Sequence, residues 1–364
     1  MNHIELFAGI GGFRQAMNLI EKDFGIPFKC IGFSEIDAKA KQTYKAVYSP
    51  KSSELDMGDI VAFNEEHDGV YLSMEIDLLT GGFPCQAFSM MGKQEGFNDD
   101  RGLMFFQIRH ILQKKKEQGK PIPFVLLENV KNLLSHDKGR TFKVITSELE
   151  KLGYKVYADV FNATDFKQAQ TRNRVLIFAT TLEIPSFTFS KKDVKNVFDL
   201  DYSEQWSIFN QPNVLSVLDK SVDDKYYLSE RIKPTILSDG SGNFKAKSEI
   251  NQLIARTLTA SMHKMHRACQ DNYYSDGFIK AKNPLRYLQR TFSKEELCKQ
   301  RIRKLTPEEA FNLQGFPKQF ASKARKAGVS NGALLKQAGN AVSVNMIYAV
   351  LYYLFIHNKL YSER

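Results

Sequence analysis

The first half of the chain alternates short apolar runs with amphipathic helical patterns, and this alternation restricts the possible folds more than any other feature. Strands are expected over residues 3–9, 28–35, 76–82, 123–130, 154–163 and 174–181, and helices over 13–24, 38–48, 103–119 and 141–153. Strands that alternate with helices of this length form a wound, mostly parallel sheet that is covered on both faces. We therefore predict an α/β fold of the Rossmann type, in which ligands bind at the carboxyl ends of the strands.

The alternation stops after Pro185, and the following residues mix aromatic, basic and small polar side chains without a clear period. This composition predicts a second, smaller and irregular domain. A later helix is expected from Thr306, with Pro307 at its first position, Glu309 in the capping-box position and Gly315 at its end. The apolar tail, residues 343–360, predicts a long helix that packs back on the sheet.

Composition and cysteine usage are those of an ordinary globular protein. We expect no apolar run that spans a bilayer, and the first residues lack the layout of a signal peptide, so the expected location is cytoplasmic. None of the four cysteines lies in a CxxC pair or beside a His cluster. Neither a disulfide framework nor a metal site is therefore expected.

Basic charge is concentrated in one segment. The whole chain has a net charge of +10, whereas residues 231–340 alone contain 21 Lys and Arg against 8 Asp and Glu. A basic segment beside a neutral remainder is typical of a polyanion-binding face. A solvated, lysine-rich surface is the alternative, and charge alone does not separate the two.

Three glycines, Gly9, Gly11 and Gly12, stand between the first expected strand and the first expected helix. Glycines there let a backbone approach a ligand and open a helix N-terminus to it, although a mere tight turn would also use them. Glu35 ends the second strand, where an acidic residue typically binds a ribose diol. Together these residues favour a nucleoside-containing cofactor, with Asp59 placed to accept from an adenine amino group.

Further positions carry groups that suit covalent chemistry. Cys85 lies in the Gly- and Pro-rich loop GGFPCQ, which gives a thiol a fixed position and access, with a structural cysteine as the alternative. Glu128 follows an apolar run in VLLENV and can act as an acid at the end of a buried strand. Gln170, Arg172 and Arg174 are expected on one face of a strand, where two arginines suit a phosphate or a base oxygen.

With these residues in place, the chain resembles the cytosine-C5 DNA methyltransferase family of bacteria and phages. The matching segments are ELFAGIGGFR, GFSEID, GDI, GGFPCQAFS, RGLMFF, LLENV, QTRNRV, RKLTPEEAFNLQGFP and QAGNAVSV, in the family's order. Nine segments in order are far more specific than any one of them. The resemblance implies a class I methyltransferase-like fold and S-adenosyl-L-methionine as the methyl donor.

The resemblance also implies a role for each catalytic position. Cys85 would attack C6 of a flipped-out cytosine, and Glu128 would hold N3 and the amino group of the base. Arg172 would steady the covalent intermediate, with Gln170 and Arg174 supporting its loop. The outcome would be transfer of a methyl group to C5 of cytosine in a specific short sequence of duplex DNA.

The same motifs imply the binding residues. The cofactor pocket would be lined by Phe7, Gly9, Ile10, Gly11, Gly12, Glu35, Ile36, Asp59, Ile60, Pro84, Asn340 and Val342. DNA would be contacted by Gln86, Ser89, Arg101, Arg256, Thr257 and Leu258. Two positions depart from the family, since Ile36 stands where an aromatic residue is often found and Ala341 where a serine is common.

The resemblance divides the chain into a catalytic, S-adenosylmethionine-binding domain of residues 1–185 plus 331–364 and a target-recognition domain of residues 186–330. We expect a monomer that binds double-stranded DNA, needs no metal or membrane, and belongs with a cognate restriction endonuclease or a phage. Three alternative functions are a methyltransferase with a tRNA substrate, a catalytically silent DNA-binding relative and a nicotinamide oxidoreductase. The basic segment in the second half of the chain counts against a tRNA substrate. The intact catalytic residues count against a silent relative, and the lack of hydride-transfer residues counts against an oxidoreductase.

Overall fold

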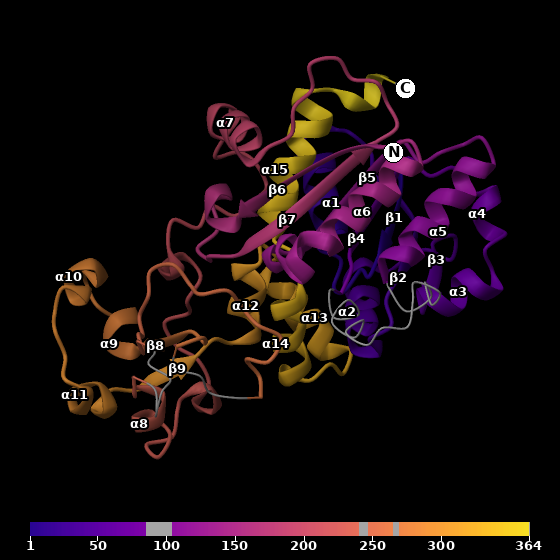
Figure 1. Cartoon of the computed structure of the whole chain (residues 1–364). Helices are drawn as coiled ribbons and strands as arrows, with labels where there is room; N and C mark the ends of the chain where they lie inside the picture. The colour runs from indigo at the N-terminus through magenta and orange to yellow at the C-terminus, as the bar shows by residue number, and fades with distance from the viewer. Residues whose placement is uncertain (85–103, 240–246, 265–268, 364) are drawn as a thin grey trace. The chain divides into compact units, whose positions relative to one another are not determined.

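The structure, a computed structural model, describes residues 1–84, 104–239, 247–264 and 269–363. The chain divides into two compact units (Figure 1). Unit 1 comprises Met1–Phe166, Asn173–Ile208 and Val344–Arg364, and unit 2 comprises Lys167–Arg172 and Phe209–Ser343. This division rests on contacts within the chain and does not test function. The target-recognition role of residues 186–330 therefore stays a prediction.

A seven-stranded mixed sheet forms the centre of unit 1. Its strands are β1 (Asn2–Leu6), β2 (Lys29–Ser34), β3 (Leu55–Gly58), β4 (Leu78–Gly82), β5 (Phe124–Val130), β6 (Lys155–Asn162) and β7 (Asn173–Thr180). The order is β3-β2-β1-β4-β5-β7-β6, and β7 is antiparallel to both of its neighbours while the other pairs are parallel. The predicted wound, mostly parallel sheet is confirmed. The strand order reverses between β1 and β4. Sheets of this kind bind ligands in the crevice at the carboxyl ends of the strands beside such a reversal.

Helices cover both faces of this sheet. They are α1 (Gly12–Phe24), α2 (Ala38–Tyr48), α3 (Ile60–Glu66), α4 (Val70–Ser73), α5 (Met104–Glu117), α6 (Arg140–Lys151), α7 (Lys191–Asp201) and α15 (Val344–Leu351), with 3-10 turns at Lys131–Leu134, His136–Gly139, Ala163–Phe166 and Leu360–Glu363 and a π-helical turn at Tyr352–His357. Apolar side chains of β1, β4, β5 and β7 pack with those of α3, α4, α5 and α6 in one buried cluster. That cluster includes Val125 of β5, whereas the adjacent Phe124 points to the other face and lies edge-on against Phe355. On this second face α15 packs on α1.

The apolar tail is part of the core of unit 1, as its composition predicts, because every residue of α15 is buried. By length and composition alone, the stretch Asn331–His357 could cross a membrane, which corrects the expectation that no such run exists. However, 83% of its most apolar window is buried inside the protein. Burial of this extent is what a core helix of a globular protein shows.

Unit 2 contains short elements joined by irregular chain. They are α8 (Lys233–Ile236), β8 (Tyr273–Ser275), α9 (Asp276–Ile279), α10 (Pro284–Leu288), α11 (Lys294–Lys299), β9 (Ile302–Lys304), α12 (Pro307–Leu313), α13 (Lys318–Lys326) and α14 (Asn331–Asn340), with 3-10 turns at Val214–Ser216 and Asp224–Tyr226. β8 and β9 form an antiparallel pair. A small apolar cluster around Tyr273 and Ile302 covers this pair.

The start of α12 follows the predicted pattern and anchors unit 2. Thr306 caps the helix by accepting from Glu309 N at 3.2 Å, and Glu309 Oε2 accepts from Thr306 N at 2.8 Å. The same buried carboxylate accepts two hydrogen bonds from Arg303 of β9, at 2.7 and 2.9 Å. Gly315, with a φ of 89°, follows the end of the helix. One carboxylate thus ties α12 to β9.

Candidate active site

The chain turns sharply after β1, at the carboxyl end of the strand. Phe7 and Gly9 have positive φ angles of 53° and 56°, and Gly11 follows with a φ of 80°. Phe7 N donates to Ser34 Oγ at 3.2 Å and Ala8 N donates to Ser34 O at 2.8 Å. The turn is therefore fixed to the end of β2. Gly9 and Gly11 lie in the left-handed region of backbone conformation, which glycine adopts more easily than other residues.

Glu35 joins the ends of β1 and β2. One carboxylate oxygen accepts from Gly9 N and the other from Asp37 N, both at 2.7 Å. Burial raises the pKa of Glu35, and the two backbone hydrogen bonds act in the opposite direction. Because each oxygen has a second lone pair, Glu35 keeps acceptor capacity for the hydroxyl groups of a ligand.

The first turn of α1 has no side-chain cap, because its N-cap residue is Gly11. By contrast, α2 is capped by Asp37, whose side chain accepts from Lys39 N and Ala40 N. Uncapped N–H groups at the start of a helix favour an anionic group of a ligand. The start of α1, where Gly12 is the first helical residue, fits such a group.

Two residues predicted to bind a cofactor beside this turn are exposed. The side chain of Ile36 is 73% exposed, which is unusual for a large apolar residue. Asp59 caps α3 by accepting from Val61 N at 3.0 Å and is exposed itself. Ile10 and Ile60 are buried. They can therefore contact a ligand only through their backbone atoms or by supporting the residues that line the pocket.

A cavity of about 390 Å³ opens beside β3 and α3. Its lining includes Gly58, Asp59, Phe63, Lys41 and His67. The Asp59 carboxylate therefore borders open space at the end of β3, and its role as an acceptor for an adenine amino group stays a prediction.

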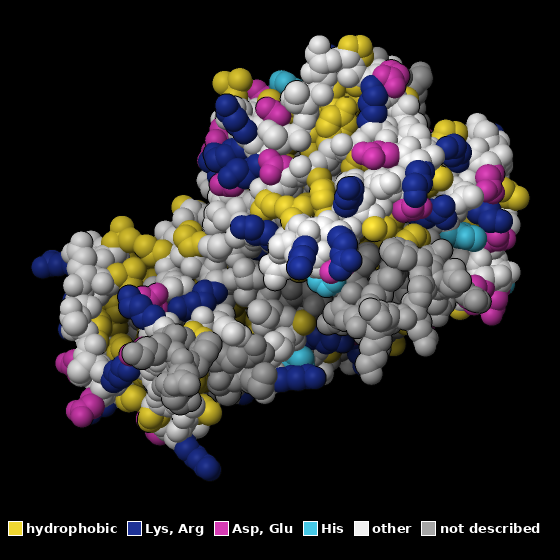
Figure 2. All heavy atoms as spheres, viewed as in Figure 1, with side chains coloured by type: hydrophobic (Ala, Val, Ile, Leu, Met, Phe, Trp, Pro, Cys, Tyr) yellow, Lys and Arg dark blue, Asp and Glu magenta, His cyan; other side chains and the backbone are white. Residues whose placement is uncertain are grey.

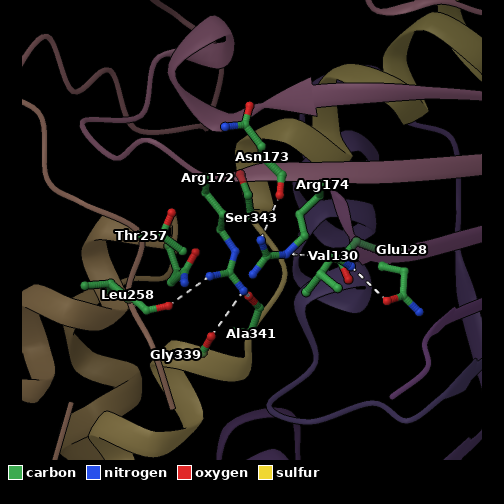
Figure 3. A network of polar contacts seen from close by, with 12 residues as sticks. Glu128, Val130, Arg172, Asn173, Arg174, Thr257, Leu258, Gly339, Ala341 and Ser343 are labelled. Carbon is green, nitrogen blue, oxygen red and sulfur yellow. Dashed lines mark hydrogen bonds and ion pairs between the residues drawn. The ribbon is translucent and has the colours of Figure 1, made fainter. Parts of the chain in front are cut away.

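Glu128 and Arg174 form an ion pair on the neighbouring strands β5 and β7 (Figure 3). Arg174 Nε lies 2.8 Å from Glu128 Oε1, and the two side chains are only 12% and 10% exposed. In the sheet, Glu128 lies opposite Gly82, the last residue of β4. Pro84 follows two residues later and is exposed, so Glu128 lies at the edge of the sheet where the Cys85 loop begins.

Asn129 fixes the chain just before Pro84. Its Nδ2 donates to Phe83 O at 2.8 Å, and its Oδ1 accepts from Val130 N at 2.8 Å. Asn129 is itself 3% exposed. Sequence reasoning missed this residue, although its place beside Glu128 in LLENV was the available signal.

Arg172 belongs to unit 2, where it is buried and donates to three backbone carbonyls (Figure 3). The acceptors are Leu258 O at 3.2 Å, Gly339 O at 3.2 Å and Ala341 O at 2.7 Å. The expectation that Gln170, Arg172 and Arg174 share one strand face is wrong, because β7 begins only at Asn173. Of the three, only Arg174 lies in the strand and reaches Glu128.

The residues just before β7 pair with the segment that contains the Thr-Leu motif. Gln170 is fully buried, donates to Leu313 O at 3.1 Å and accepts from Leu258 N at 3.0 Å. Thr257 Oγ1 donates to Thr171 O at 2.5 Å. Leu258 is 2% exposed, whereas Thr257 is partly exposed. Of these two predicted DNA contacts, Thr257 is the one whose side chain solvent can reach.

The C-terminal motif QAGNAV also lies against this segment within unit 2. A Cβ atom on Gly339 would lie 2.2 Å from the carbonyl carbon of Thr259, so no larger residue fits. Asn340 is exposed and Val342 is 9% exposed. Because the remaining cofactor candidates are in unit 1, the contribution of Asn340 and Val342 to the cofactor pocket stays a prediction.

Basic side chains of unit 2 are exposed, and several of them have acidic partners. Figure 2 shows Lys and Arg side chains on the surface of this part of the chain. Arg256 Nη1 donates to Glu249 O at 2.9 Å. Exposed ion pairs join Lys280 to Asp276, Lys294 to Asp239 and Arg301 to Asp224. Such surface pairs contribute little to stability, so these cations can exchange partners at small cost.

Four residues predicted from sequence, Cys85, Gln86, Ser89 and Arg101, lie outside the described residues. Within the part of the chain that the structure describes, no group of three or more His, Cys, Asp or Glu side chains could hold a metal ion.

The fold and the site together define a class I methyltransferase: a sheet of this order with an antiparallel seventh strand, a glycine turn after β1 and an acidic residue after β2. The family model described as C-5 cytosine-specific DNA methylase matches residues 1–355. The chain therefore belongs to the C-5 cytosine-specific DNA methylase family, as its sequence resemblance predicts.

Curated relatives agree with this assignment. The type II methyltransferase M1.ScrFI of Lactococcus lactis subsp. cremoris is 36% identical over 353 residues, which cover 95% of this chain and 76% of the relative. The type II methyltransferase M.HpaII of Haemophilus parainfluenzae is 33% identical and covers 95% of this chain and 87% of its own length. The chain is thus a DNA cytosine-5 methyltransferase, and a methyl donor and DNA are its reactants.

Solved structures share the fold. The S. pombe Dnmt2 methyltransferase superposes with a TM-score of 0.72 at 18% identity, covering 98% of this chain and 99% of that chain. The Entamoeba histolytica methyltransferase EhMeth gives a TM-score of 0.70 at 19% identity, with 98% of both chains covered. At this identity the similarity concerns the fold alone.

Proposed function

We propose that this enzyme transfers a methyl group from S-adenosyl-L-methionine to C5 of cytosine in a specific short sequence of duplex DNA, by attack of Cys85 on C6 of a flipped-out base. The observation that carries the proposal is the Glu128–Arg174 ion pair at the edge of the sheet where the chain leaves β4 toward Cys85. A carboxylate at a strand end and a thiol that follows the neighbouring strand in the sequence are the two groups that addition to a cytosine ring needs.

The residues around the turn after β1 fit S-adenosyl-L-methionine. The uncapped start of α1 suits its carboxylate, Glu35 suits the ribose hydroxyls, and exposed Ile36 offers an apolar surface to the adenine. Asp59, beside its cavity, suits the adenine amino group. When bound, S-adenosyl-L-methionine supplies an electrophilic methyl group.

The chain's own residues account for the remaining chemistry. The Cys85 thiolate forms a bond to C6, and the electron pair of the C5–C6 double bond moves toward C5. Glu128 stabilises N3 and the exocyclic amino group as charge develops there. After C5 is methylated with that electron pair, a base removes the C5 proton. The C–H electrons then re-form the double bond, and the C6–S bond breaks with its electrons returning to Cys85.

Arg174 holds Glu128 in place for this step. Its guanidinium is 2.8 Å from the carboxylate and little exposed, so its charge keeps the Glu128 carboxylate at this edge of the sheet. Arg172 instead organises the backbone of unit 2 through three carbonyls. In this proposal the role of Arg172 near the covalent intermediate is indirect.

The basic residues of segment 231–340 are proposed to bind the DNA backbone. The base must leave the stacked duplex, because C6 cannot be attacked within it. We further propose that the protein is a cytoplasmic monomer that belongs to a restriction-modification system. The support for the last point is that relatives such as M1.ScrFI are named type II methyltransferases.

Incubation with S-adenosyl-L-methionine tritiated in the methyl group tests this proposal. Purified enzyme is offered duplex DNA or tRNA, and the labelled product is digested to nucleosides. The expected result is label in 5-methyldeoxycytidine from duplex DNA, and none with Cys85→Ser. Label in tRNA alone, or label that survives Cys85→Ser, would overturn the proposal.

A further inference from the structure

We propose that Tyr48, at the C-terminal end of α2, positions the glycine turn for the methyl donor by holding the carbonyl group of Gly11. This inference rests on the proposed use of S-adenosyl-L-methionine. It assigns a positioning role to a residue that the motifs around the cofactor turn do not include.

The contact is direct. Tyr48 Oη donates to Gly11 O at 2.6 Å, across 37 positions of sequence. Gly11 N donates to Ala8 O at 2.7 Å, so Gly11 is held on both sides of its Cα atom. Because Gly11 is the N-cap residue of α1, its position sets where the first N–H groups of the helix point.

The tyrosine ring also fills the space next to Gly11. A Cβ atom at this position would lie 2.3 Å from Cε2 of Tyr48 and 2.9 Å from Cε2 of Tyr44. With a φ of 80°, Gly11 already occupies the left-handed region. The ring and the hydroxyl of Tyr48 therefore define both the space and the direction of the turn.

Tyr48 is itself held by a shielded ion pair. The Arg14 guanidinium lies over the Tyr48 ring at 4.8 Å from its centroid and forms two hydrogen bonds to Glu54, at 2.7 and 3.1 Å. The Arg14 and Glu54 side chains are 12% and 8% exposed. Arg14 Nη1 also donates to Tyr44 Oη at 3.1 Å. This arrangement restricts the ring of Tyr48 to one orientation beneath the turn.

The substitution Tyr48→Phe removes the hydroxyl and keeps the ring under Arg14. The matched control is Tyr154→Phe, since Tyr154 Oη donates to another backbone carbonyl, Ile122 O at 2.8 Å, on a different part of unit 1. Both variants leave one carbonyl without its tyrosine partner, but only one of these carbonyls belongs to the turn. The comparison separates positioning from general stability.

Calorimetric titration with S-adenosyl-L-methionine and with S-adenosylhomocysteine gives the readout. We expect Tyr48→Phe to raise Kd about three- to tenfold, the loss typical of one hydrogen bond, and Tyr154→Phe to leave Kd within about twofold. In steady-state assays, Tyr48→Phe should raise KM for the donor more than it lowers kcat. If Tyr48→Phe does not fold, Arg14→Lys is the second variant. It removes the guanidinium that lies over the Tyr48 ring and should also raise Kd.

An unchanged Kd in the Tyr48→Phe variant, with the unmodified enzyme binding normally, would overturn this inference alone. Equal losses in Tyr48→Phe and Tyr154→Phe would also overturn it, because they would show general destabilisation. If the unmodified enzyme bound neither compound, the proposed methyl donor itself would be wrong, which the first two outcomes do not imply.

Discussion

Arg174 Nε lies 2.8 Å from Glu128 Oε1, on two antiparallel strands of the same sheet. The pair is shielded from solvent, yet it lies at the end of β5 opposite the last residue of β4. Water screens the attraction between two shielded charges less than it screens an exposed pair, so this contact holds the two side chains together. This relationship distinguishes Arg174 from Arg172, two positions before it.

Substitution Arg174→Ala is expected to lower kcat about 100-fold or more, the usual cost of losing one preorganised charged group at a reacting centre. The affinity for the methyl donor should stay within about twofold, since the polar partners described for Arg174 are Glu128 and Asn173 O. Arg140→Ala is the matched control, because Arg140 forms an exposed ion pair with Asp137 at 2.6 Å. Single-turnover methyl transfer and calorimetry measure the two effects, and a kcat within threefold of normal would remove Arg174 from the mechanism.

Substitution Arg172→Met should instead destabilise the protein. It leaves three carbonyls of unit 2 without their guanidinium partner, at a cost of about 3 kcal/mol or more and a fall in Tm of about 5 °C or more. Differential scanning calorimetry beside Arg140→Ala, which removes only an exposed ion pair, gives the comparison. A Tm for Arg172→Met equal to that of Arg140→Ala would refute the structural role of Arg172.

The buried Glu5 of β1 gives the stability a pH dependence. Burial raises the pKa of Glu5 to about 7, from an ordinary value near 4.5. The native state therefore keeps this proton where the unfolded chain has released it. The corresponding stability is fully present below about pH 4.5 and is lost as pH rises to about 7, by about 3 kcal/mol in total.

Glu5→Gln does not titrate, so its Tm relative to the unmodified protein should rise by several degrees between pH 5 and pH 8. Thermal unfolding at four pH values across this range measures the difference. A Tm difference that is constant across the range would show that Glu5 titrates normally.

DNA affinity should fall steeply with salt, because residues 231–340 carry 21 basic against 8 acidic side chains. Between about 50 and 200 mM salt we expect at least a 100-fold loss in affinity, from release of counterions at several phosphates. Fluorescence anisotropy with a labelled duplex measures the slope. A flat dependence would mean that the basic segment is not the DNA-binding surface.

The fold could be predicted because its determinants are local. Each of the longer strands and helices has its own hydrophobic period, and right-handed crossovers leave few ways to join them. β3, Leu55–Gly58, has only four residues, too few for a period to register. The pairing directions of β7 could not be predicted either, because they depend on partners distant in sequence.

The site could be predicted only in part. The glycine turn and Glu35 lie where strand ends and residue type indicate, since a parallel sheet gathers these ends on one edge. The alternation of Gln170, Arg172 and Arg174 indicated a shared face, but the strand begins at Asn173, so the period does not extend over all three. Tyr48 could not be found from sequence, because it reaches Gly11 only through tertiary packing.

The most direct test of the mechanism is covalent trapping on a duplex that contains the target site with 5-fluorocytosine. Fluorine at C5 cannot leave as a proton does, so the bond between Cys85 and C6 should persist once the methyl group has been transferred. We predict a DNA–protein adduct on a denaturing gel that requires S-adenosyl-L-methionine, is absent with Cys85→Ser, and forms far more slowly with Glu128→Gln. An adduct of equal yield with Cys85→Ser, or none despite active methyl transfer to ordinary cytosine, would contradict the proposed attack.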